Sequence, residues 1–189
     1  MTRNSLIRLG GLAAIAGGAA WVALWVLGNW LVRQLPLGPI ESHIQSGSIQ
    51  GPILNLLVVG AMVAIIAIAV LHDSRSERYG SLAMLATLTA AVGLVMGLVG
   101  WLVFEQTVPL AVAATLVTVG LLLASVGIVG LGIVTIRARV LPWWCGAALI
   151  AGSPLSAFLW PFMGVPWMVV GYALFRAAGD PPQQPSRVR

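Results

Sequence analysis

Uncharged apolar runs, each about as long as a bilayer is thick or longer, follow one another along most of this chain. They cover residues 9–32, 52–71, 81–104, 108–136 and 140–175. A helix needs roughly 20 apolar residues to cross a hydrocarbon core of about 30 Å. The repetition of such runs predicts an all-α fold, a polytopic transmembrane helical bundle.

The composition agrees with lipid as the solvent of this chain. It is 59% hydrophobic and 8% charged, whereas soluble domains carry roughly 25% charged residues. A net charge of +5 would suggest nucleic acid in a soluble protein. Here the arginines fall between the apolar runs, which indicates membrane topology and no nucleic-acid partner. Cys145 is the single cysteine, so an internal disulfide and a cysteine-clustered metal site are excluded.

The last apolar run is too long for one crossing and short for two. Residues 140–175 are 36 residues, or about 54 Å of helix, against about 60 Å for two full crossings. We predict two short helices over 141–159 and 162–177 that turn tightly near Trp160-Pro161. One crossing plus a re-entrant piece is the alternative. The favoured interpretation gives six spans in a single transmembrane domain over 1–179, followed by a Pro-rich, disordered cytoplasmic tail over 180–189.

The arginines orient the predicted spans. With six spans and both termini in the cytoplasm, only Arg33 lies outside, and the other nine arginines are cytoplasmic, as the positive-inside rule requires. A five-span arrangement would weaken this bias. Four of the cytoplasmic arginines are candidates for contact with anionic lipid headgroups. They are Arg75, Arg78, Arg137 and Arg139.

Tryptophans mark the predicted borders of the spans. The segment "NWLVRQLPLG" at 29–38 is partly repeated in "GWLVFEQTVPLA" at 100–111, and both contain a Trp followed by a Pro where a helix must stop or start. Indole has an apolar body and one N–H donor, so it settles at the headgroup level. The candidate interface anchors are Trp30, Trp101, Trp143, Trp144 and Trp160.

The C-terminal part of the chain carries a family resemblance. "RARVLPWWCG" begins at Arg137, and an apolar helix and a short Gly/Pro-broken helix follow, ending in "GYALFRAAG". This pattern over 137–179 resembles many small polytopic membrane proteins of GC-rich bacteria. The resemblance implies a multi-helix membrane protein and no particular activity. We predict that the protein lies in a bacterial inner membrane, which it crosses several times.

No predicted span contains an Asp, Glu, Arg or His in its interior. Ion pumps, proton-coupled antiporters and voltage sensors need charged groups at depth, and an intramembrane protease needs paired catalytic residues there. We therefore predict that the protein is not an enzyme and has no metal. His43 and His72 are predicted on opposite sides of the bilayer and are interpreted as interfacial, so they cannot clamp one haem together. A pigment held by one histidine and a partner chain stays open, with His43 as a weak candidate.

Polar residues gather on the predicted outer side. The candidate cluster consists of Asn29, Glu41, His43, Asn55 and Glu105. One interpretation is a ligand or partner site at the outer face. The other, which we favour, is a solvated loop with ordinary capping. A metal site there would need further ligands beyond Glu41 and His43.

Small residues within the spans predict close helix packing. The pair Gly93-x-x-x-Gly97 is the best candidate for a close crossing, with a helix of the same chain or of a partner. The hydroxyl groups at depth are expected to bond back to their own helix carbonyls. They belong to Thr87, Thr89, Thr115, Thr118 and Ser125.

Three functional hypotheses follow. The leading one is a non-catalytic accessory subunit that packs against partner helices, lipid or a hydrophobic cofactor, with a membrane-protein partner or a second copy. The second is an uncoupled facilitator or exporter of a neutral lipophilic solute, with its path in the Gly/Pro-broken last hairpin. The third is an enzyme that modifies lipid at the outer face through Glu41, His43 and Glu105.

Overall fold

The computed structural model of this chain describes residues 2–34, 50–76, 79–104, 109–158 and 163–179, and these residues form helices and no strand. The all-α prediction is confirmed. The helices occur where the uncharged runs predicted them, and the first begins about six residues earlier, at Arg3. In chain order they are α1 Arg3–Gln34, α3 Gln50–Arg75, α4 Gly80–Phe104, α5 Leu110–Ala138, α6 Trp143–Phe158 and α7 Gly164–Ala177. The predicted tail over 180–189 lies outside the described residues.

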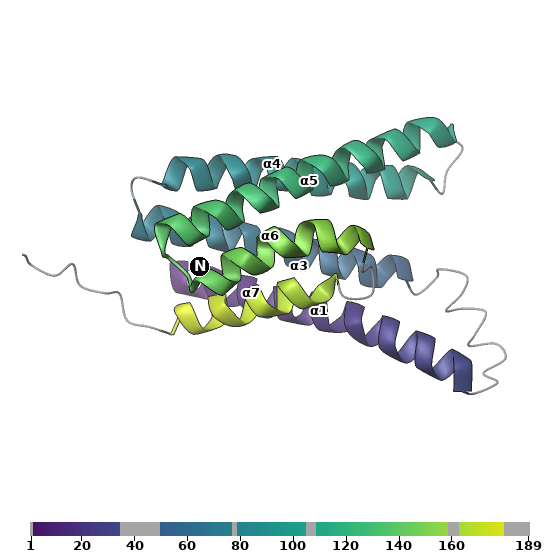
Figure 1. Cartoon of the computed structure of the whole chain (residues 1–189), viewed down its shortest axis with the longest axis horizontal. Coiled ribbons are helices and arrows are strands. Elements are labelled where there is room, and N and C mark those ends of the chain that lie inside the picture. Colours follow the sequence, from purple (N-terminus) through teal and green to yellow (C-terminus); the bar gives the residue numbers. More distant parts are fainter. Residues whose placement is uncertain (1, 35–49, 77–78, 105–108, 159–162, 180–189) are drawn as a thin grey trace, which may run out of the picture.

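Four segments of these helices are long and apolar enough to cross a membrane: Arg3–Val26, Pro52–Arg75, Gly80–Leu102 and Ala111–Ala138. By contrast, α6 has 16 residues and α7 has 14, which correspond to about 24 Å and 21 Å. Both are shorter than a hydrocarbon core of about 30 Å. Their ribbons also end well short of those of α1, α4 and α5 (Figure 1). The last apolar run is therefore a hairpin of two short helices.

The helices pack in two groups. The most extensive contact joins α4 to α5, and the next joins α1 to α3 and to α7. The groups are linked where α3 meets α4 and where α6 bridges α5 and α7. In Figure 1 the α4–α5 pair lies along one side of the bundle, α1 and α7 lie along the other, and α6 runs between them.

Glycines allow α1 and α7 to approach closely. Gly11 of α1 and Gly171 of α7 face one another across the α1–α7 contact. A Cβ added to Gly11 would lie 2.7 Å from the Gly171 carbonyl oxygen, and one added to Gly171 would lie 2.6 Å from the Gly11 oxygen. Any side chain at either position would collide with backbone, so glycine is required there. Without a hydrophobic drive between helices in lipid, such close packing is what joins them.

Large apolar side chains cover the outside of the bundle, most densely on α4. Met84, Leu85 and Leu88 are each more than 60% exposed. Soluble monomers rarely present contiguous apolar surface of this extent. A helix that is apolar on all sides fits a hydrocarbon environment.

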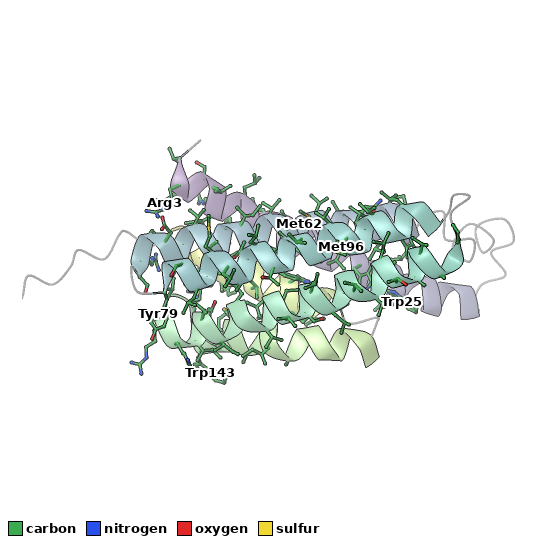
Figure 2. All side chains as sticks on the ribbon, turned by 90° about the horizontal axis from the view of Figure 1, so that it is seen from above. Arg3, Trp25, Met62, Tyr79, Met96 and Trp143 are labelled. Atoms are coloured by element: carbon green, nitrogen blue, oxygen red, sulfur yellow. The ribbon has the colours of Figure 1, made fainter. Side chains whose placement is uncertain are left out.

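The charged side chains that the structure describes gather at one end of the bundle, which we call the arginine end. We call the opposite end the far end. At the arginine end, α1, α4 and α6 begin and α3, α5 and α7 end. Figure 2 shows Arg3, Tyr79 and Trp143 at this end and Trp25 toward the far end. The arginines with described side chains are Arg3, Arg8, Arg75, Arg137, Arg139 and Arg176.

Polar contacts tie several helix ends together at the arginine end. Arg3 donates to the Val70 carbonyl at 3.2 Å and lies 3.5 Å from the Asp73 carboxylate. Arg75 donates to the carbonyls of Val140, at 3.5 Å, and Ala177, at 3.3 Å. The last carbonyls of a helix have no partner within it. Arg75 supplies one for the end of α7 and one for the turn between α5 and α6.

Candidate intramembrane binding site

A cavity of about 180 Å³ lies between the two groups of helices, in the half of the bundle toward the far end. It is partly open to the surroundings. Residues of α3, α4, α5, α6 and α7 line it. From α3 these include Leu54, Leu57, Val58 and Ala61; from α4, Gly93, Leu94, Gly97, Leu98 and Trp101; from α5, Val117, Leu121, Ala124, Ser125 and Ile128; and from α6 and the start of α7, Ala148, Leu149, Gly152, Met163, Pro166 and Trp167.

The short last hairpin bounds this cavity. Gly152 of α6 lies against the beginning of α7, because a Cβ added to it would meet the Pro166 ring at 2.5 Å. The cavity lies beside this contact, with Met163 at the N-terminus of α7 in its wall. A hairpin with two full-length helices would extend further along α4 and α5. The shortness of α6 and α7 therefore determines where the cavity is found.

The predicted Gly93–Gly97 pair lies on the wall of this cavity, and its two glycines play different parts. A Cβ added to Gly93 would lie 2.6 Å from the Gly120 carbonyl oxygen and 2.7 Å from the Ala124 Cα, so Gly93 joins α4 closely to α5 of the same chain. A Cβ added to Gly97 would meet nothing within 4 Å. The backbone of Gly97 also lies in this crossing, since a Cβ added to Gly120 would lie 2.9 Å from the Gly97 Cα. A side chain is therefore excluded at Gly93, whereas the side of Gly97 on which its Cβ would lie is open.

The chemistry of the lining is almost wholly apolar. None of the residues that line the cavity carries an ionisable side chain, and Ser125 supplies the one hydroxyl among them. Trp101 and Trp167 bring two indole rings to the lining from α4 and α7. No described lining residue is a base that could activate the Ser125 hydroxyl. The cavity can hold a neutral apolar molecule.

The hydroxyl of Ser125 behaves unlike its neighbours on α5. Thr115 and Thr118 donate to the carbonyls four residues earlier, at 2.7 and 2.8 Å, and Thr89 of α4 does so at 2.9 Å. Ser125 makes no side-chain hydrogen bond to any described residue. The expectation that hydroxyls at depth bond back to their helix is confirmed for the three threonines. This expectation is wrong for Ser125. It is also wrong for Thr87, because the buried Oγ1 of Thr87 has no partner among the described residues.

His72, predicted as an interfacial residue at the cytoplasmic end of a span, is buried between helices near the end of α3. It is 0% exposed, and its Nε2 lies 3.1 Å from the Thr135 Oγ1 of α5. The Thr135 hydroxyl donates its one proton to the Leu131 carbonyl at 2.7 Å. Nε2–H of His72 must therefore be the donor to Thr135, and in the neutral imidazole Nδ1 then carries no proton. Nδ1 is buried and has no partner in the described part of the chain.

The predicted outer polar cluster is described only at Asn55. Its side-chain oxygen is buried on α3 and has no hydrogen-bond partner among the described residues. The side chains of the other members lie outside the described part. These are Asn29, Glu41, His43 and Glu105. Among the described residues, no three His, Cys, Asp or Glu side chains are grouped so that they could hold a metal ion.

The predicted interface residues lie partly within the described structure. Trp101, Trp143 and Trp144 are exposed, Trp143 at the arginine end (Figure 2). The side chains of Trp30 and Trp160 lie outside the described residues. Arg137 and Arg139 are exposed, Arg75 is bound to backbone carbonyls, and Arg78 is outside the described residues. Contact of these arginines with lipid headgroups stays a prediction.

Sequence reasoning missed the cavity because its lining residues are spread over five helices, from Leu54 to Trp167. In the sequence, almost every lining residue looks like an ordinary apolar residue of a membrane-spanning helix. The sequence signals for the cavity are indirect. One is the glycine at position 97, within a small-residue pattern on a predicted span. The other is the presence of Gly152 and Pro166 in an apolar run that is too short to cross a bilayer twice. A scan of known protein families and searches of curated proteins and of solved structures match nothing.

Proposed function

We propose that this protein is an integral membrane protein that holds a neutral apolar molecule between its helices, in an accessory and non-catalytic role. The observation that carries the proposal is the cavity, with its apolar lining and its lack of ionisable groups. Desolvating a charge there would be costly without a paired group, so the bound molecule is uncharged. The exposed apolar face of α4 would lie against lipid or a partner helix.

The size of the cavity limits what it can enclose. An engineered cavity of about 150 Å³ lined by apolar side chains binds benzene. The cavity here, at about 180 Å³, is slightly larger. It would enclose a single ring or a short segment of hydrocarbon chain. A larger ligand would extend through the open side of the cavity.

We also propose that the arginine end faces the cytoplasm of a bacterial inner membrane, with six helices and both termini on that side. The gathering of the described arginines at one end supports this orientation. Single cysteines introduced by Arg139→Cys and Pro109→Cys, in a Cys145→Ala background, test it. An impermeant maleimide should label the first only in inverted vesicles and the second only in right-side-out vesicles. The reverse pattern would overturn the orientation.

The binding function is tested by occupying the cavity from Gly97. Wild-type protein, Gly97→Leu and the control Gly130→Ala are extracted gently from the native membrane, and native mass spectrometry records the small molecules each retains. In Gly130→Ala the new Cβ would lie 3.5 Å from Ala86, an ordinary contact away from the cavity. We expect Gly97→Leu to retain at least tenfold less of an apolar molecule than the other two. Equal retention by all three would refute the proposal.

A facilitator of a neutral lipophilic solute is the second candidate, because the cavity is partly open and lies where the α6–α7 hairpin ends. In this case the same molecule would pass through the site. Sealed vesicles loaded with a neutral fluorescent solute separate the two functions. Release that Gly97→Leu abolishes, and that persists without an ion gradient, would favour the facilitator. Retention of the ligand without release favours the accessory role.

A further inference from the structure

We propose that the molecule held in the cavity contains a neutral ring of about the size of benzene with one hydroxyl or carbonyl oxygen, and that this oxygen hydrogen-bonds to Ser125. The inference rests on the proposed binding function and specifies its ligand. It also assigns Ser125 as the residue that determines specificity, a role that its place in an apolar helix did not predict.

The first argument is that the Ser125 hydroxyl has no bond within the described structure. A serine in a helix usually donates to a carbonyl of the preceding turn, as Thr115 and Thr118 do on this same helix. Ser125 lines the cavity and makes no such bond. A hydroxyl removed from water costs free energy unless it finds a partner. A ligand oxygen in the cavity would supply that partner.

The second argument concerns the polar groups of the lining. Ser125 is the one hydroxyl of the lining, and apolar atoms provide almost all of the remaining surface. The other polar side-chain groups of the lining are the indole N–H groups of Trp101 and Trp167, which can only donate. A hydroxyl donates and accepts, so both an alcohol-type and a carbonyl-type oxygen suit Ser125. Ser125 is therefore the one side chain of the lining that can bind either kind of oxygen.

The third argument concerns shape. Trp101 and Trp167 contribute indoles to the lining from different helices. Aromatic rings prefer edge-to-face or offset contacts with one another, and each such pair contributes more than its buried area alone. A volume close to that of the benzene-binding cavity accommodates one such ring. A linear acyl chain would fit the volume, but it would leave the Ser125 hydroxyl without a partner.

The test compares two probes that differ by one hydroxyl, fluorobenzene and 4-fluorophenol. Each is titrated by ¹⁹F NMR into lipid nanodiscs that contain wild-type protein, Ser125→Ala, Thr118→Ala or Gly97→Leu, with protein-free nanodiscs correcting for partition into lipid. Thr118→Ala is the matched control, because it removes a hydroxyl from α5 that is bonded within its own helix.

We expect wild-type protein and Thr118→Ala to bind both probes. Ser125→Ala should weaken 4-fluorophenol about fivefold, the effect of one hydrogen bond, and change fluorobenzene less than about twofold. Gly97→Leu should abolish binding of both probes. If Ser125→Ala leaves the 4-fluorophenol affinity unchanged while Gly97→Leu still blocks both probes, the Ser125 inference is overturned and the binding function stands. If neither probe binds wild-type protein above the protein-free control, the binding function itself fails.

Discussion

At the arginine end, polar side chains from several helices meet and bind backbone carbonyls of their neighbours, whereas the lining of the cavity in the other half of the bundle is almost wholly apolar. Glycine crossings occur in both halves, at Gly11–Gly171 and at Gly93–Gly120. Arg3, Asp73 and Arg75 link α1, α3, α7 and the turn between α5 and α6. One turn deeper, His72 and Thr135 link α3 to α5. In the cavity half, the lining offers one hydroxyl and no charge.

The difference between the two halves suggests that the arginine end stabilises the fold and that the cavity half is suited to binding. Polar contacts with fixed geometry hold helix ends in register, and they cost little near the headgroups, where water is close. The apolar half has fewer such constraints, so it can enclose a ligand without breaking a network. We therefore expect substitutions at the arginine end to change stability, and substitutions around the cavity to change binding.

Gly93→Leu should have the largest effect on stability, because it disrupts the contact between α4 and α5 beside the cavity. The new side chain would collide with the backbone of α5 at Gly120 and Ala124. Backbone cannot move aside as a side chain can, so we expect a loss of at least about 3 kcal/mol or failure to fold. Thermal unfolding in detergent measures it. Gly97→Ala, four residues away on α4, should unfold like the wild type, and equal damage from both would contradict the distinction between these glycines.

Thr135→Val should have the next largest effect, because it removes the acceptor of a buried donor. The His72 Nε2–H would lose its partner inside the bundle. An unsatisfied buried donor costs about 1–3 kcal/mol, toward the lower end for hydrogen bonds between membrane helices. We expect a loss of about 1–2 kcal/mol in the free energy of unfolding. Thr135→Ser keeps the hydroxyl and should lose less than half as much; equal losses would assign the effect to packing alone.

Arg75→Met tests the polar ties between helix ends. It keeps an apolar stem of similar length and removes the bonds to Val140 and Ala177. Each bond from a charged donor to a carbonyl near water contributes modestly, so we expect a loss of about 1 kcal/mol. Chemical denaturation in mixed micelles measures it. Arg137→Met, at an exposed position on α5, is the control and should change stability little.

Asp73→Asn should have the smallest effect. The Arg3–Asp73 pair is 3.5 Å long and its side chains are 47% and 82% exposed. Exposed ion pairs contribute about 0.2–1 kcal/mol and are weakened by salt. We expect a loss of less than about 0.5 kcal/mol at low salt and none at high salt. A loss above about 1 kcal/mol that persists at high salt would show that this contact is part of a larger network.

The helices could be predicted because the charges delimit them. The uncharged run over 81–104 is α4, Gly80–Phe104, almost residue for residue. The burial of His72 could not be predicted, since it depends on which face of α3 meets Thr135 of α5, 63 residues along the chain. The different roles of Gly93 and Gly97 could not be predicted either, because the Gly-x-x-x-Gly spacing treats both glycines alike. The orientation of α4 about its own axis relative to α5 makes their surroundings differ.

The lengths of the helices have a further consequence for a bilayer around this protein. On one side it presents α4, with 25 residues, and on another the α6–α7 hairpin, with 16 and 14. These correspond to apolar heights of about 37 Å and 21–24 Å. In a bilayer around this protein, lipid beside these two short helices would become locally thinner, at a cost of fractions of a kcal/mol per Å of hydrophobic mismatch. The bilayer would then be deformed more on the side of α6 and α7 than on the side of α4.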